Sequence, residues 1–277
     1  MIYDVHGNDI SDNRTQRFKR EMQYTYDRDE TTGAFYTHVL LQQKNSYGEK
    51  QYPFVYWPNY PNGGIESAYE LNQRKNYNMV VNGGTYLAPY GAGVTLTGTP
   101  TGTVIQNGVV LQQGDGNNTP WPSLAWVLTI DDEGVLGYAR HTDSAAELVA
   151  NGIVSAVSGF IPILTNYTNI QDVESQDISY IDRTDDSQRQ IIGQYENGDY
   201  AIITAEGRDN QGGNWFTMKQ IQALCKQLGM KFAFALDGGG STETVVGYKQ
   251  LNPFYDNTYG RVNPTFLVFN GSDTFPA

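Results

Sequence analysis

An apolar strand followed directly by three glycines is the feature that most constrains this chain. Residues 231–236 form the apolar run, and Asp237-Gly238-Gly239-Gly240-Ser241-Thr242 comes next. Consecutive glycines cost backbone entropy, which a fold tolerates where it needs positive φ or a close approach. Such a loop can aim backbone N–H groups at an anion beside Asp237 and the two hydroxyls. A tight turn that needs glycine explains the same residues, so the motif alone leaves both interpretations open.

The segment before this strand predicts the clearest helix, over residues 217–228. Thr217 and Gln220 have the spacing of a capping box, and Gly229 stands where a helix ends in the left-handed region. Apolar residues recur on one face of this helix, which is typical of a helix packed on a sheet. The order is therefore helix, strand and glycine loop.

The rest of the chain predicts short strands and few helices. Asn107-Gly108 supplies the positive φ values of a type I′ turn inside a hairpin over 103–112. Helices are expected over 67–76 and 144–151, and a second hairpin over 124–130 and 135–140. Further strands are expected over 35–41, 78–82, 153–158, 190–194, 200–204 and 265–270. Without regular βαβ alternation this pattern favours an α+β fold. We expect residues 1–50 to be an N-terminal arm or attachment segment and residues 51–277 to be the domain.

Charge and composition exclude several classes of protein. The 277 residues carry a formal net charge of −12 with no basic run, so we expect no nucleic-acid partner. The single cysteine, Cys225, permits neither an internal disulfide nor a cysteine-based zinc site. Residues 1–20 lack the apolar core of a signal peptide, and no apolar run is long enough for a membrane span. We therefore expect synthesis in the cytoplasm, and association with a virion is a further expectation.

Five ordered motifs give the chain a resemblance to a known family. Residues 236–242 resemble the Asp-Gly-Gly-Gly-Ser signature of the phosphodiester glycosidases, the family of the lysosomal uncovering enzyme. Residues 81–86, 157–164, 189–193 and 206–208 resemble four further blocks of that family, in the same order. Two departures stand out, since Glu206 replaces an aspartate and Gln190-Ile191 replaces Thr-Ala. The first eight residues are also similar to the start of bacteriophage tail or baseplate proteins, which suggests a phage or bacterial member.

The resemblance implies a fold and a reaction. It implies a single α+β domain with a bent mixed, largely antiparallel sheet and a few helices. The implied reaction is hydrolysis of a sugar joined through its anomeric carbon to a phosphate, with a carbohydrate-phosphate substrate. Because His6, His38 and His141 are scattered, we expect no catalytic transition metal. We also expect no cofactor, and a calcium ion bound among the Asp and Asn loops stays open as an alternative. Other virion proteins or a second copy of the chain are the partners considered.

Roles for individual residues follow from the chemistry of that reaction. It needs a carboxylate near the anomeric carbon and positive charge on the departing phosphate. We assign Asp237, Glu206 and Arg208 to catalysis. The predicted substrate-binding residues are Arg189, Asn82, Gly83, Gly238, Gly239, Gly240, Ser241, Thr242 and Arg261. Each charged residue has a structural alternative, an ion pair for the arginines and a turn cap for Asp237.

Three functions compete at this point. The favoured one is the hydrolase, acting on a glycoconjugate or a cell-surface glycopolymer. The second is a non-catalytic module that binds a glycopolymer in the same pocket. The third is a structural tail or baseplate protein with a dead pocket. The retained charges of Asp237, Arg189 and Arg208 argue against the third, because a dead site has no physical need for them.

Overall fold

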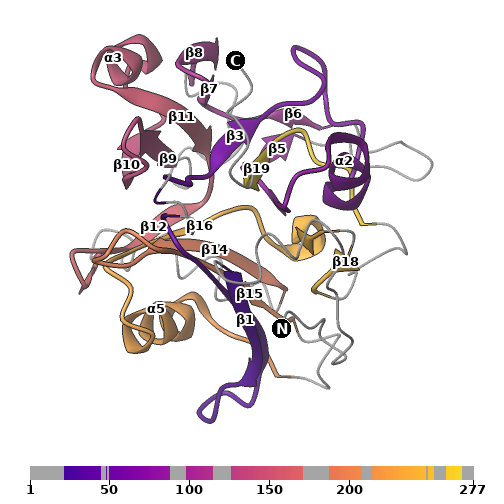
Figure 1. The fold of residues 1–277 in the computed structure, drawn as a ribbon, viewed down its shortest axis with the longest axis vertical. Coiled ribbons are helices and arrows are strands. Elements are labelled where there is room, and N and C mark those ends of the chain that lie inside the picture. The colour runs from indigo at the N-terminus through magenta and orange to yellow at the C-terminus, as the bar shows by residue number, and fades with distance from the viewer. Residues whose placement is uncertain are drawn as a thin grey trace.

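Antiparallel strands from distant parts of the chain pair into three main sheets (Figure 1). The computed structural model describes residues 22–44, 48, 50–87, 98–114, 126–170, 187–207, 214–247, 249–252 and 260–269. Within these residues every strand pair is antiparallel. No helix among them is both long enough and apolar enough to cross a lipid bilayer.

The largest sheet has seven strands and carries the candidate site at one end of its central strands. In spatial order its strands are β1 (Met22–Arg28), β2 (Phe35–Leu41), β15 (Tyr200–Ala205), β14 (Arg189–Gln194), β16 (Phe232–Ala235), β12 (Ile161–Thr165) and β13 (Thr168–Asn169). Ile191 and Ile203 point toward helix α5 (Met218–Gln227), whereas Ile192 and Ile202 point toward the other sheets. Since both faces are covered, β14 and β15 are buried along their whole length.

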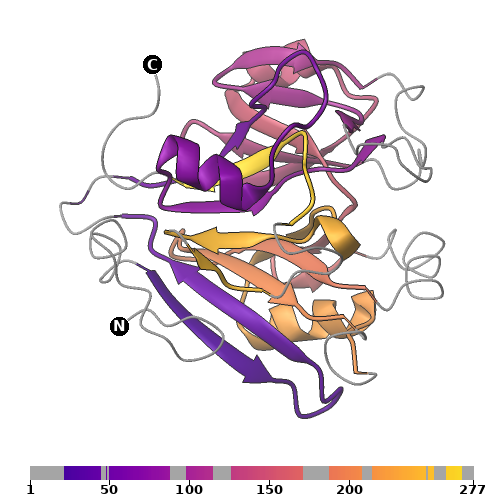
Figure 2. The same ribbon diagram turned by 90° about the vertical axis from the view of Figure 1, so that its right-hand side faces the viewer.

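The other two main sheets have five strands each and lie together on the opposite side of the core (Figure 2). The first contains β10 (Leu136–Arg140), β9 (Trp126–Asp131), β11 (Ile153–Ser158), β7 (Val104–Gln106) and β8 (Val109–Gln112). The second contains β18 (Lys249–Gln250), β17 (Thr244–Val246), β4 (Met79–Asn82), β19 (Phe266–Phe269) and β3 (Phe54–Tyr56). Helices α2 (Ala68–Lys75) and α3 (Ala145–Ala150) cover their outer faces, and β5 (Tyr86–Leu87) pairs with β6 (Thr99–Pro100).

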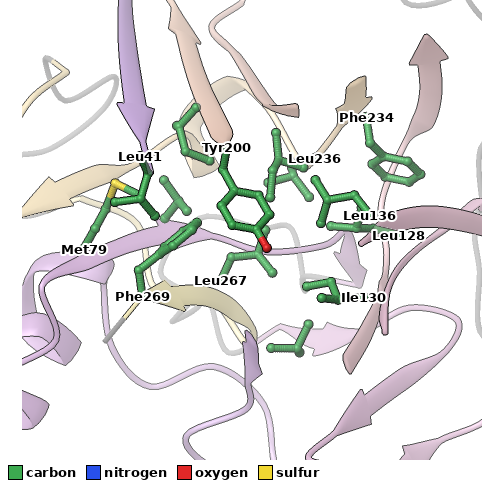
Figure 3. Packing of buried hydrophobic residues seen from close by; sticks show 14 of the residues in the cluster. Leu41, Met79, Leu128, Ile130, Leu136, Tyr200, Phe234, Leu236, Leu267 and Phe269 are labelled. Atoms are coloured by element: carbon green, nitrogen blue, oxygen red, sulfur yellow. The ribbon is translucent and has the colours of Figure 1, made fainter. Parts of the chain in front are cut away.

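The main core lies where the three sheets meet. Figure 3 shows Tyr200 of β15 surrounded by side chains from the two five-stranded sheets, including Ile130 and Phe269. Its ring is fully buried, and its hydroxyl donates to the carbonyl oxygen of Gly134 at 2.7 Å. Because one strand reaches residues of all three sheets, burial here joins them into a single apolar core.

Local signals at the helix ends are confirmed. Thr217 and Gln220 form both hydrogen bonds of the predicted capping box on α5. Ser67 and Glu70 form the same arrangement on α2, which ends at Asn76 in the left-handed region. These bonds satisfy backbone groups that a helix end otherwise leaves unpaired.

Two expectations about architecture are corrected. We expected one bent, largely antiparallel sheet with a few helices. The antiparallel pairing and the low helix content are confirmed for the described residues, but their strands form three main sheets instead of one. We also set residues 1–50 apart as an arm, whereas the described part of that segment belongs to the large sheet. β2 pairs with β15 over six residues, and Val39 and Leu41 lie in the main core. The strand expected over 35–41 is confirmed as β2, whereas β1 was not predicted, because polar residues such as Gln23, Thr25 and Asp27 occupy its exposed positions.

Candidate active site

Three adjacent central strands bring Arg189, Glu206 and Asp237 to the same end of the large sheet. β14 begins at Arg189, directly opposite Ala205 at the end of β15, and β16 ends on the same side. Glu206 follows β15 at once, and Asp237 lies two residues beyond β16. Because neighbouring strands are about 4.8 Å apart, the backbones at Glu206 and Asp237 are separated by roughly 10 Å, with β14 between them.

The glycine loop is shaped by its contact with the residue before Arg189. The N–H of Gly239 donates to the carbonyl oxygen of Gln188 at 2.8 Å, and Gly239 has φ +58°. A Cβ on Gly238 would lie 2.8 Å from that same oxygen. Gly239–Ser241 then form a single 3-10 turn, which includes Gly240. Glycine is therefore required at 238 by close approach and at 239 by positive φ.

The loop is the partly exposed part of an otherwise buried segment. Leu236 is buried, residues 237–240 are partly exposed, and burial resumes at Ser241. The N–H of Gly238 donates to Oδ1 of Asp237 at 3.0 Å, which holds this carboxylate against the loop backbone. A ligand approaching this edge therefore meets the carboxylate of Asp237 together with glycine backbone.

Asn82 holds the two ends of the loop together. Its Nδ2 donates to the carbonyl oxygen of Asp237 at 2.7 Å, and its Oδ1 accepts from the N–H of Glu243 at 3.0 Å. Asn82 is completely buried. We predicted it as a substrate contact, but in this structure its amide serves the loop, so its effect on a ligand would pass through Asp237.

Gly83 continues the same support. Its carbonyl oxygen accepts from the N–H of Asp237, and its own N–H donates to the carbonyl oxygen of Thr265 at 2.9 Å. A Cβ on Gly83 would lie within 2.8 Å of Thr265 atoms. This close approach accounts for the glycine at position 83, which holds the backbone of Asp237 through its carbonyl oxygen.

Tyr86 completes the group around the loop, in a role that the sequence did not predict. Its hydroxyl accepts a hydrogen bond from Oγ of Ser241 at 3.3 Å. Burial and then the charge of Asp237 raise the pKa of Tyr86 to about 12, while Ser241 and Arg261 act in the opposite direction. Tyr86, Asp237, Ser241 and Arg261 are therefore close enough to interact, and the tyrosine is neutral at physiological pH. The aromatic position after Asn82-Gly83-Gly84 was the available signal.

The three predicted arginines differ in what the structure describes. Arg189 is largely buried and lines a small hollow with Met218 and Gly238, beside the glycine loop. Arg261 is partly exposed and interacts with Tyr86. Arg208 lies outside the described residues. Arg189 belongs to the large sheet and Arg261 to the segment before β19, so two positively charged groups near the loop come from distant parts of the chain.

The second carboxylate, Glu206, is buried with an exposed fraction of 3%. Its Oε1 accepts from the hydroxyl of Tyr26 on β1 at 2.8 Å. Its backbone N–H donates to the carbonyl oxygen of Phe35 on β2. The hairpin that we expected to be an arm therefore positions a predicted catalytic residue.

Two further side chains at the end of the loop, those of Thr242 and Glu243, are buried. Thr242 is buried, and its carbonyl oxygen accepts from Nδ2 of Asn252 at 2.9 Å. Glu243 follows Thr242 directly and is 1% exposed. It accepts from the N–H of Ala68 at the start of α2, and burial raises the pKa of its carboxyl well above the usual value.

A buried polar network explains one departure from the family motif. Oε1 of Gln190 accepts from the hydroxyls of Thr204 and Thr244, each at 3.3 Å, and those two hydroxyls are 2.8 Å apart. Gln190 and Thr204 lie on the large sheet, whereas Thr244 lies on β17 just after the glycine loop. The longer side chain at position 190 therefore ties the loop's far end to the large sheet.

The described residues contain no cluster of three His, Cys, Asp or Glu side chains that could hold a metal ion. Cys225 is buried on the inner face of α5. His38 makes a hydrogen bond of 3.0 Å with the hydroxyl of Tyr195, away from the loop. The ionisable groups that the structure describes around the glycine loop are carboxylates, arginines and a neutral tyrosine.

Solved structures with the same fold include one of known activity. The catalytic domain of zebrafish N-acetylglucosamine-1-phosphodiester α-N-acetylglucosaminidase, auto-inhibited by its pro-peptide, matches with a TM-score of 0.64 at 17% identity, over 90% of this chain and 82% of that chain. A hypothetical protein from Synechocystis matches with a TM-score of 0.67 at 13% identity, over 91% and 62% of the two chains. A putative exported protein from Burkholderia pseudomallei K96243 gives 0.60 at 12% identity, over 86% and 74%.

Sequence comparison adds a prophage relative and a family. The SPbeta prophage-derived uncharacterized protein YomE of Bacillus subtilis (strain 168) is 36% identical over 80 residues, which are 29% of this chain and 12% of that protein. The family model of the phosphodiester glycosidases matches residues 75–269, which include the glycine loop and both described arginines. The chain belongs to the phosphodiester glycosidase family.

Proposed function

We propose that this protein hydrolyses a sugar-1-phosphodiester by breaking the bond between the anomeric carbon and the phosphate oxygen. The observation that carries the proposal is the arrangement of Asp237, Arg189 and Glu206 at adjacent strand ends beside a glycine loop. Membership of the phosphodiester glycosidase family supports this class of hydrolase.

The proposed step transfers the anomeric carbon from phosphate to water. The C1–O bond breaks, its electron pair leaves on the phosphate oxygen, and positive charge develops at C1 and the ring oxygen. Asp237 stabilises that charge, because its carboxylate is held at the partly exposed edge of the loop. A water oxygen then bonds to C1 and its proton passes to a carboxylate. The products are the free sugar and a phosphomonoester.

The arginines act on the leaving group. Phosphate departs with negative charge, so it needs permanent positive charge more than it needs a proton donor. Arg189 at the start of β14 and Arg261 before β19 supply this charge, and Arg208 is the proposed third arginine that binds the phosphate. The neutral hydroxyl of Tyr86 adds a donor for the same oxygens.

A glycopolymer or glycoconjugate of a bacterial cell surface is the proposed substrate. The prophage-derived relative supports a phage or bacterial origin. Under this proposal the protein acts at a surface where sugars are joined through phosphates, in association with a virion. Its contacts there are with other virion proteins or with a second copy of the chain.

The test is hydrolysis of a panel of sugar-1-phosphodiesters, including nucleotide sugars and teichoic-acid fragments. Wild type should release free sugar, and Asp237→Asn should lower the rate by about 10²–10⁴-fold, the usual range for a positioned carboxylate. Asp132→Asn, in the exposed turn between β9 and β10, is the matched control and should keep full activity.

Two other outcomes would contradict this mechanism. Equal rates for wild type and Asp237→Asn would remove Asp237 from it. If no compound of the panel is cleaved but wild type binds a glycopolymer that Arg189→Met no longer binds, the site belongs to a binding module instead.

A further inference from the structure

A polar hollow lies at the end of the large sheet opposite to the candidate active site. It measures about 450 Å³ and is lined by the turn between β14 and β15, the turn between β12 and β13, and the start of β16. An adjoining hollow of about 480 Å³ shares Tyr195, Glu196 and Asn197 with it. Both volumes fall within the range of small-molecule sites, about 300–1,000 Å³.

The separation of the hollow from the glycine loop follows from the strands that connect them. Arg189 begins β14 at the active-site edge, and Gln194 ends the same strand in the hollow. Five residue steps in a strand span about 17 Å. β16 repeats this relation, because Lys231 before it lines the hollow and Asp237 after it belongs to the loop. The hollow therefore lies at the other end of the same strands, apart from the glycine loop.

The turn between β12 and β13 carries an aromatic residue at a position where the backbone conformation favours glycine. Asn166 and Tyr167 have φ +46° and +63°, the conformation of a type I′ turn in which glycine is favoured second. The turn between β7 and β8 has the same form with the favoured pair, Asn107 and Gly108, at φ +51° and +71°. Tyr167 is 42% exposed, so burial of its ring does not account for this choice. Strain of this kind marks functional positions.

Hydrogen bonds fix Tyr167 above the β14–β15 turn. Its hydroxyl donates to Oε2 of Glu196 at 2.9 Å, and Oε1 of Glu196 accepts from Nζ of Lys231 at 3.2 Å. Asp199 accepts from the N–H of Gln43 at 2.9 Å and from Nδ2 of Asn197 at 2.8 Å. The charges of Lys231 and Glu196 offset each other, so the hollow has no excess positive charge to attract phosphate.

We propose that the two adjoining hollows form a second binding site, for an uncharged carbohydrate, with Tyr167 of the second hollow as the ring on which a sugar stacks. Sugars present an apolar face to aromatic rings and hydroxyls to amides. The first hollow is lined by Thr165, Asn166 and Asn197, and the second by the exposed Tyr167 and again by Asn197. The site would hold a glycan chain while the loop at the other end acts on a different part of it. The proposal does not depend on the reaction assigned to the glycine loop.

The test uses an array of uncharged oligosaccharides of glucose, galactose, N-acetylglucosamine, N-acetylgalactosamine and rhamnose, followed by calorimetry on those that bind. Tyr167→Gly should retain or gain thermal stability, because it relieves the positive φ, yet weaken binding by at least about tenfold. Tyr167→Phe keeps the ring and should bind within about threefold of wild type.

Two control variants test whether the sugar binds in the hollow itself. Gly108→Tyr puts the same strained residue at the equivalent turn, where a Cβ meets no atom within 4 Å. It should lower thermal stability and leave sugar binding unchanged. Asp237→Asn should also bind as wild type does. Absence of binding by wild type, undiminished binding by Tyr167→Gly, or loss of binding in Asp237→Asn would each overturn the proposal.

Discussion

Asn82 donates its side-chain amide to the carbonyl oxygen of Asp237 at 2.7 Å, so a fully buried residue of β4 holds the loop that carries the candidate catalytic carboxylate. The two residues are 155 positions apart in sequence. The same amide accepts from the N–H of Glu243, beyond the glycines. One side chain therefore sets the separation of the loop's two ends.

Asn82→Asp should destabilise the protein and abolish activity. The substitution keeps an oxygen for the N–H of Glu243 but places a second oxygen against the carbonyl of Asp237, in a buried site. Loss of a buried hydrogen bond together with an unsatisfied polar group costs about 2–4 kcal/mol. Urea denaturation measures the cost. The stability of Asn107→Asp, in an exposed turn, should stay within about 0.5 kcal/mol of wild type. An equally small effect of Asn82→Asp would mean that Asn82 does not hold the ends of the glycine loop together.

Gly238→Ala tests whether the loop needs a close approach to Gln188. The new Cβ would lie 2.8 Å from a backbone oxygen that cannot move as a flexible side chain can. Crowding of this kind costs about 1–3 kcal/mol, and we expect loss of most hydrolytic activity because Asp237 is the adjacent residue. Gly108→Ala adds only the cost of its positive φ, about 1–2 kcal/mol, and should keep full activity. Normal activity of Gly238→Ala would show that the loop tolerates a side chain there.

Glu243→Gln should stabilise the protein increasingly as pH rises. Burial raises the pKa of Glu243 in the folded state above the ordinary value of 4.5, so above pH 4.5 the folded protein retains a proton that the unfolded chain releases. Wild type therefore loses stability from pH 4.5 up to the folded-state pKa, whereas glutamine has no proton to lose. At pH 4 the two proteins should differ least.

Urea denaturation between pH 4 and pH 8 measures this difference. The gap between Glu243→Gln and wild type should widen with pH and then level off. Glu30→Gln, at an exposed turn, is the control and should show no such widening. A gap that is constant or narrows with rising pH would mean that Glu243 is not held in its neutral form by burial.

Local signals made parts of the fold predictable from sequence. The capping box of Thr217 and Gln220 placed α5, and Asn107-Gly108 placed the hairpin of β7 and β8, because both depend on residues near in sequence. β3 and β17 were missed, since strands of three buried residues show no period. β12 carries Pro162 beside an irregularity in its pairing with β16. Because proline is unusual inside a strand, the sequence did not predict β12.

The candidate site divides in the same way. The glycine loop, Arg189 and Glu206 could be proposed from ordered motifs. The contacts that hold these residues in place could not be predicted, because they join residues far apart in the sequence. Glu206 is held by Tyr26, 180 residues earlier, and Gln190 meets Thr244 between two sheets. A single sequence does not reveal contacts of this range.

The most direct test of the central claim is hydrolysis of one accepted sugar-1-phosphodiester in H₂¹⁸O, with the phosphorus product followed by ³¹P NMR. A glycosidase breaks the bond between carbon and oxygen, so we predict a phosphomonoester that contains no ¹⁸O. Incorporation of ¹⁸O into the phosphomonoester would mean that water attacks phosphorus, and it would contradict the assignment of Asp237 and the arginines to cleavage at the anomeric carbon.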